Sequence, residues 1–81
     1  LRLPLVLEKT DISSHVSSLV NAAFSKQLDG GAITLDVAPD LWASVDKMAL
    51  DSMVLNLVDN ALKYGKGSRV LIAVRAISHD Q

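Results

Sequence analysis

The fold is decided by KMALDSMVLNLVDNALKYG, residues 47–65, a stretch that holds no proline and whose single glycine is its last residue. Its apolar residues recur with the spacing of one helix face, and Asp46 stands directly before it as a candidate N-cap. The sequence therefore predicts one long helix over 47–64, with Gly65 as its C-terminal cap. The apolar face consists of Leu50, Val54, Leu57, Val58, Ala61 and Leu62.

At about 100° per residue, the opposite arc of this helix carries Asn56, Asn60, Lys63 and Tyr64, together with Asp59. Most polar helix faces simply meet water, and an Asp59–Lys63 pair adds only a few tenths of a kcal/mol, roughly. Asparagine is nevertheless a poor helix former, and two in mid-helix cost about 1 kcal/mol together. Such a cost favours a function for the two amides.

The chemistry of these four side chains suits a metal–nucleotide complex. A carboxamide oxygen can ligate a hard cation such as Mg²⁺ without adding negative charge beside phosphates. Asn56 and Asn60, one turn apart, can reach one cation and its waters. Lys63 offers a positive charge for phosphate oxygens, and Tyr64 offers a ring or hydroxyl for base or sugar.

The residues before this helix predict a strand, a helix and a stop. Residues 3–8 form a short apolar run that predicts an edge strand, since Pro4 has no amide hydrogen for a ladder. Asp11 is a candidate N-cap for a helix from Ile12 to near residue 27, because its apolar residues follow the helical period. The pair of glycines at 30–31 ends that helix.

Two strands between the helices and one after them complete the pattern. Residues 33–37 alternate apolar and polar, and residues 41–45 form a second short strand, so we expect a hairpin. Residues 69–78 are apolar on both alternating sets, which predicts a strand covered on both faces or paired deep in a sheet. The element order predicts an α+β fold: a two-layer sandwich with helices on one face of a mixed sheet.

Composition bounds the class of protein. The 81 residues suffice for one small domain, and 8 basic against 9 acidic side chains give a net charge of −1. With aromatics at 4%, nothing indicates a nucleic-acid partner. The absence of cysteine excludes disulfides and thiolate metal sites and fits a reducing cytosol. No apolar run approaches the roughly 20 residues that a membrane-spanning helix needs.

Four other features have structural explanations. The segment 65–68, GKGS, lacks the preceding strand and glycine of a phosphate-binding loop, so we interpret it as a turn. His15 and His79 have no partners at metal-ligand spacing and are expected to face solvent. Trp42 is expected to pack against other residues, and the serines at 13, 14, 17 and 18 are expected to be exposed.

Residues 51–64, DSMVLNLVDNALKY, closely resemble the N-box of sensor histidine kinases. These belong to the ATP-binding (GHKL) superfamily that also includes gyrase, the mismatch-repair MutL proteins and a heat-shock chaperone. The resemblance extends to residues 7–20, 32–46 and 69–78, which are similar to the first strand and helix, the hairpin and the following strand of that domain. It implies an α/β sandwich.

The resemblance also implies roles for single residues. Asn60 would ligate Mg²⁺, Asn56 would lie close to the metal and phosphates, Lys63 would contact phosphate, and Tyr64 would line the pocket for ATP. In the hydrolysing members a glutamate stands at the position of Asn56. A carboxamide cannot act as general base on water, so the resemblance implies a kinase that passes phosphate to a histidine on a separate dimerisation domain, in partnership with a response regulator.

We expect residues 1–81 to be the N-terminal half of such a domain, with the N-box at 51–65. The family's glycine-rich segments and lid would follow, so this half alone should bind ATP weakly or not at all and be inactive by itself. We also expect self-association through the open strand 69–78, and a cytoplasmic location. Two alternatives stay open: a non-catalytic interaction module or degenerate kinase, and a fragment of an ATP-hydrolysing relative.

Overall fold

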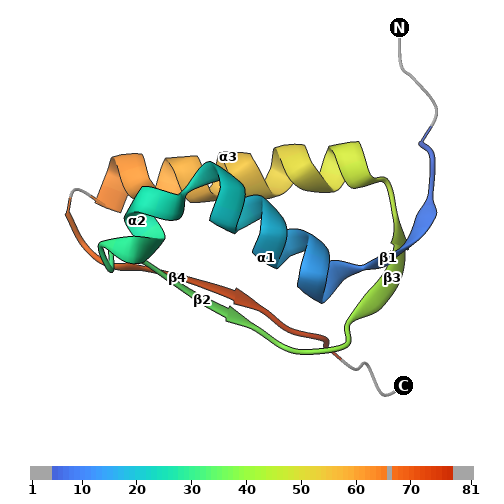
Figure 1. The fold of residues 1–81 in the computed structure, drawn as a ribbon. Coiled ribbons are helices and arrows are strands. Elements are labelled where there is room, and N and C mark those ends of the chain that lie inside the picture. Colours follow the sequence, from blue (N-terminus) through green and yellow to red (C-terminus); the bar gives the residue numbers. More distant parts are fainter. Residues whose placement is uncertain (1–4, 66, 78–81) are drawn as a thin grey trace, which may run out of the picture.

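The computed structural model of the chain describes residues 5–65 and 67–77. Within these residues the fold is α+β, as predicted. Its elements are β1 (Glu8–Asp11), α1 (Ile12–Ala23), α2 (Ser25–Asp29), β2 (Ile33–Val37), β3 (Trp42–Val45), α3 (Lys47–Gly65) and β4 (Val70–Val74). In Figure 1, α1 and α3 lie on the same side of the β2–β4 pair, and β1 and β3 run together at one end.

The predicted single mixed sheet is wrong for the described residues, which form two sheets of two strands each. β1 pairs with β3 in antiparallel fashion, with Glu8 opposite Val45. β2 pairs with β4 in parallel, from Ile33 opposite Val70 to Val37 opposite Val74. A parallel pair needs a long crossover connection, which here includes β3 and α3.

The expected hairpin between residues 33–37 and 41–45 is also wrong, because the segment between β2 and β3 is fastened to the start of α1. Ser13 Oγ donates to the carbonyl of Ala38 at 2.6 Å and accepts from the N–H of Leu41 at 2.9 Å. The N–H of Ile12 donates to the Leu41 carbonyl at 2.7 Å. These contacts send the chain away from β2 and toward β1.

The first strand lies later than predicted. It covers Glu8–Asp11, whereas we expected residues 3–8; residues 5–7 are outside any strand, and Pro4 lies outside the described residues. The position of β1 in the sequence is set by its pairing with β3 and not by hydropathy, since the paired segment EKTD is polar. Within it Thr10 is buried, and its hydroxyl donates to the Glu8 carbonyl at 2.9 Å.

The first helix is capped as predicted but is shorter. Asp11 Oδ1 accepts from the N–H of Ser14 at 3.1 Å, which satisfies a free donor of the first turn. The helix breaks at Phe24, whose φ of −131° is not helical, and α2 follows. Phe24 packs against the core, so tertiary packing interrupts a stretch in which the sequence has no glycine or proline.

The core is small and lies between the helices and the β2–β4 pair. Its buried apolar side chains within the described residues are Val16, Val20, Ile33, Val54 and Val58. β4 is shorter than the predicted 69–78, and Ser78 lies outside the described residues. Its two faces differ, because Ile72 is half-buried while Leu71 is 65% exposed. The expectation of a strand covered on both faces is therefore wrong for the described part.

The long helix α3 is confirmed and extends through Gly65, one residue beyond the predicted end. The Gly65 carbonyl accepts from the N–H of Ser68 at 3.0 Å, which begins the turn toward β4. At the other end Asp46 Oδ1 accepts from the N–H of Ala49 at 3.2 Å, the contact of an N-cap. A second oxygen of Asp46 accepts from the N–H of Val6 at 3.2 Å.

These hydrogen bonds make stability depend on pH. The N–H groups of Ala49 and Val6, followed by that of Met48, hold the pKa of Asp46 below its ordinary 3.8. A carboxyl group with a lowered pKa in the folded state stabilises the fold above the unfolded pKa, of about 4, and this contribution is lost as the pH falls through the folded value. We expect Asp46→Asn to lower stability at pH 7 and to match the wild type near pH 2.

Urea denaturation at the two pH values measures the effect. Asp29→Asn, at the exposed end of α2, serves as the control and should change stability little at either pH. An Asp46→Asn penalty of the same size at both pH values would contradict the assignment.

Candidate functional site

The candidate site is the exposed face of α3. The structure places Asn56, Asn60, Lys63 and Tyr64 on this face, and the side chains of all four are exposed, Tyr64 at 80%. α3 reaches this arrangement without a kink-forming residue, so the one-turn spacing of the two asparagines is kept. The four residues predicted from the sequence are therefore together on one surface.

The two carboxamides make no hydrogen bond to any other described residue. By contrast, Asn21, the remaining asparagine, donates from Nδ2 to the Ser17 carbonyl at 2.7 Å. The amide oxygens of Asn56 and Asn60 are thus free to accept from water or to ligate a cation. The carboxamide group is neutral, so it adds no negative charge beside a bound cation and its other ligands.

The lysine of the site is held by a neighbour. Lys63 Nζ lies 2.9 Å from Asp59 Oδ2, one turn earlier, and both side chains are more than half exposed. An exposed pair of this kind contributes at most about 0.5 kcal/mol, so a phosphate group can take Lys63 from Asp59 at little cost. Asp59 also balances the positive charge when no anion is bound.

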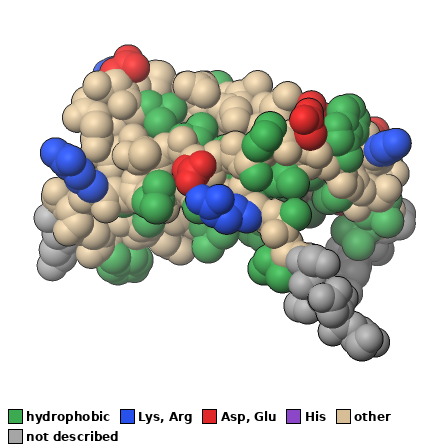
Figure 2. Space-filling view, turned by 90° about the horizontal axis from the view of Figure 1, so that it is seen from below, with side chains coloured by type: hydrophobic (Ala, Val, Ile, Leu, Met, Phe, Trp, Pro, Cys, Tyr) green, Lys and Arg blue, Asp and Glu red, His purple; other side chains and the backbone are tan. Residues whose placement is uncertain are grey.

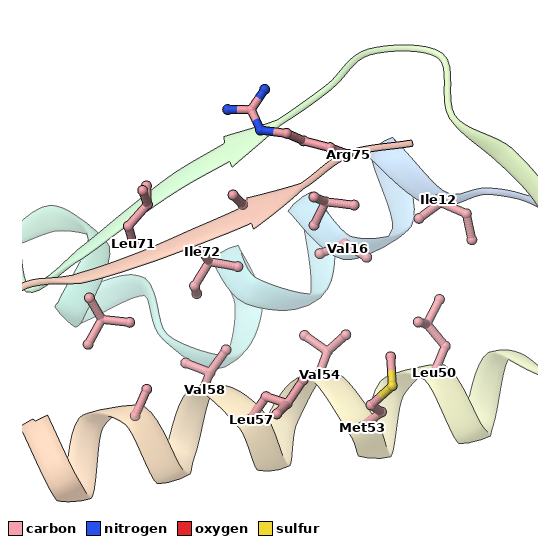
Figure 3. A pocket seen from close by; sticks show the side chains of 14 residues that line it. Ile12, Val16, Leu50, Met53, Val54, Leu57, Val58, Leu71, Ile72 and Arg75 are labelled. Atoms are coloured by element: carbon pink, nitrogen blue, oxygen red, sulfur yellow. The ribbon is translucent and has the colours of Figure 1, made fainter. Parts of the chain in front are cut away.

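Beside this face lies an apolar groove of about 440 Å³ between α3 and β4, with α1 at its back (Figure 3). Met53 and Leu57 line it from α3, and Leu71 and Ile72 are among its residues from β4. At about 100° per residue, Met53 and Leu57 lie at the border between the apolar and the polar face of α3, next to Asn60 and Tyr64. None of the four predicted residues lines the groove itself; the polar face borders it.

A link between α1 and α3 was not predicted. His15 Nε2 lies 2.5 Å from Asp51 Oδ1, and both side chains are partly buried. The expectation that His15 faces solvent is therefore wrong. The pair fixes the first turns of α3 against α1, and no local signal in the sequence could find it because 36 residues separate the partners.

Two further expectations are corrected. Trp42 is 57% exposed on β3, with Lys9 Nζ 6.0 Å from its ring centroid, so it does not serve as a packing residue in the described part of the chain. Ser13 is half-buried and joins α1 to the segment before β3. Both residues act in local structure, distant from the face of α3.

In residues 5–65 and 67–77, no cluster of three or more His, Cys, Asp or Glu side chains could hold a metal ion. Within the same residues, no helix is both long and apolar enough to cross a bilayer. Any metal at the face of α3 would rest on amide oxygens, ligand phosphates and water.

Comparison with known proteins gives two matches along nearly all of the chain. The swarming motility regulation sensor protein RssA of Serratia marcescens is 32% identical over 77 residues, 93% of this chain. The signal transduction histidine-protein kinase AfsQ2 of Streptomyces coelicolor is 34% identical over 76 residues, 94% of this chain. No family model and no solved structure matches.

The matched segment is a small part of each relative. The chain spans 16% of the length of the sensor protein and 13% of the length of the histidine-protein kinase. The chain is thus similar to one section of proteins that sense and transmit signals.

Proposed function

We propose that this chain is part of the ATP-binding domain of a sensor histidine kinase and that the exposed face of α3 binds Mg²⁺–ATP. The observation that carries the proposal is the pair of free carboxamides, Asn56 and Asn60, one turn apart on a helix that is unbroken over 19 residues. The similarity of the chain to part of a histidine-protein kinase supports it.

In this proposal Asn60 ligates Mg²⁺ through its amide oxygen, and Asn56 lies near the metal and the phosphates. Magnesium keeps several of its waters and takes only a few oxygen ligands from a protein, which suits an exposed amide. Lys63 leaves Asp59 to contact a phosphate oxygen. Tyr64 packs on the base or sugar, beside the largely apolar groove between α3 and β4.

The reaction that we propose is phosphoryl transfer and not ATP hydrolysis. Asn56 has no basic group that could take a proton from water, so this side chain cannot promote the attack of water on a bound γ-phosphate. The phosphoryl group would pass to a histidine on a separate dimerisation domain and then to a response regulator. Such transfer depends on positioning and charge stabilisation, and no residue of this chain acts as a catalytic acid or base.

The location that fits these partners is the cytoplasm, where ATP and response regulators are found. By itself the 81-residue chain should bind ATP with a dissociation constant above the low-micromolar range, since its α3 face is open to solvent and offers few contacts. The longer protein that contains it should bind nucleotide well.

A second candidate, a non-catalytic interaction module, is favoured by the exposed apolar residues Met53, Leu57 and Leu71 around the groove. Autophosphorylation separates the two functions. The longer protein is incubated with Mg²⁺ and radiolabelled ATP, and the expected product is a protein phosphate that is labile in acid and stable in base. A protein that binds ATP but forms no such phosphate, or that forms free phosphate only, would contradict the kinase proposal.

A further inference from the structure

Asp59 lies on the same exposed face of α3 as the two free carboxamides. It follows Asn56 by three residues and directly precedes Asn60. At about 100° per residue, the three side chains fall within an arc of about 100° on the helix. The side chain of Asp59 is 52% exposed. Its carboxylate is therefore the negative charge nearest to the two amides along the helix.

The ion pair of Asp59 with Lys63 differs from the other three ion pairs among the described residues. Those three join separate segments: α1 with α3, β1 with α3, and β2 with the residue after β4. The Asp59–Lys63 pair lies within one helix and holds no second element in place. The pair can therefore open without a change in the fold.

Aspartate is a costly residue for this position. Like asparagine, it is a poor helix former, because its short polar side chain competes for backbone hydrogen bonds. Glutamate would form the same kind of pair with a lysine four residues later and would favour the helix more. The shorter side chain of Asp59 keeps the carboxylate close to the helix surface, beside Asn56 and Asn60. Residue type and position thus both indicate a role at the site.

Positive charge for a triphosphate is scarce in the described part of the chain. Among the described residues of α3, Lys63 is the only basic one on the exposed face. The side of the molecule beneath β2 and β4 shows few lysine and arginine side chains, and these stand apart from one another (Figure 2). A phosphate group bound at the α3 face must therefore take Lys63, and Asp59 then loses its partner.

We propose that Asp59 makes nucleotide binding at this face depend on Mg²⁺, a role that rests on the function proposed above. When Lys63 turns to a phosphate, the Asp59 carboxylate is left as an unpaired negative charge beside the triphosphate. Repulsion between the two opposes the binding of ATP without metal. With Mg²⁺ at Asn60, the same carboxylate attracts the cation and accepts hydrogen bonds from its waters. Asp59 thus exchanges one positive partner, Lys63, for another.

The size of the effect follows from the strength of charge–charge interactions in a wet surrounding. Two unit charges about 7 Å apart change an affinity by roughly 3–7-fold where the dielectric is close to that of water. The several charges of metal-free ATP increase this factor, and screening by salt reduces it. We therefore expect Asp59 to weaken the binding of metal-free ATP by about 5–10-fold.

The affinity for ATP with and without the metal tests this role. The longer protein is titrated with ATP by calorimetry, once with excess Mg²⁺ and once with EDTA, at equal ionic strength. In Asp59→Asn, the dissociation constant in EDTA divided by that in Mg²⁺ should fall about 5–10-fold, mainly because metal-free ATP binds more tightly. Asp59→Glu restores the charge and should keep most of the wild-type ratio. Asp29→Asn removes the same charge at the exposed end of α2 and should leave the ratio unchanged.

A fall of the ratio in Asp59→Asn alone, with recovery in Asp59→Glu, would support the role of Asp59. Equal ratios in the wild type and in Asp59→Asn would overturn it and leave the Mg²⁺–ATP site in place. An equal fall in Asp59→Asn and Asp29→Asn would also overturn it, because it would show an effect of net charge alone. A wild-type protein that binds ATP neither with Mg²⁺ nor with EDTA would contradict the proposed function itself, and the role of Asp59 with it.

Discussion

Replacing Asn60 with alanine is expected to reduce autophosphorylation of the longer protein by roughly 10²–10³-fold, the usual effect of removing one preorganised polar group from a charged transition state. The amide oxygen of Asn60 is free in the structure and is the proposed ligand of Mg²⁺. Without it the metal loses a fixed contact, and the γ-phosphate loses its alignment. The measurement is the initial rate of phosphohistidine formation at saturating ATP.

Matched variants separate the loss of the metal ligand from a loss of folding. Asn21→Ala changes an asparagine that is also exposed but bonds to the Ser17 carbonyl, and it should retain nearly full activity. Asn60→Asp restores an oxygen ligand but adds negative charge beside the phosphates, so its activity should also be low. Full activity in Asn60→Ala would contradict the proposal that Asn60 ligates Mg²⁺.

Val20→Ala is expected to lower the free energy of unfolding by about 2–3 kcal/mol, because it deletes two buried methyl groups and leaves a cavity. Val20 is 0% exposed and lies in the centre of a core with only five buried apolar side chains within the described residues. A small domain has about 0.05–0.15 kcal/mol of stability per residue, so this loss is a large part of the total.

Urea denaturation measures the change, with Val6→Ala as control. Val6 is 63% exposed, so the same chemical deletion there should change stability by less than about 0.5 kcal/mol. Equal losses in the two variants would show that the core does not lie where the structure places it.

The elements with strong local signals could be predicted from the sequence. α3 was predicted because its apolar period runs without a helix breaker, and its N-cap was predicted from Asp46. The N-cap Asp11 and the strand Ile33–Val37 were also predicted from local signals, a capping residue before an apolar helix face and an alternating apolar pattern. The fold class follows from the order of these elements.

Pairing could not be predicted in the same way. Which strands join depends on contacts such as those of Ser13 with Ala38 and Leu41, which are more than 20 residues apart in the chain. The His15–Asp51 contact likewise joins residues that are far apart in the sequence. At the site, the sequence predicted that four residues share a face, and the structure adds that this face borders an apolar groove.

The most direct test uses the three asparagine side chains of the 81-residue chain. Each gives its own amide NH₂ signals in an NMR spectrum, and Mn²⁺ in place of Mg²⁺ broadens signals near the bound metal. With millimolar ATP and trace Mn²⁺, a metal bound at the proposed site should broaden the Asn60 signals first and then those of Asn56, and the Asn21 signals should be unchanged. Equal broadening of all three, or broadening of Asn21 alone, would contradict the proposed Mg²⁺–ATP site.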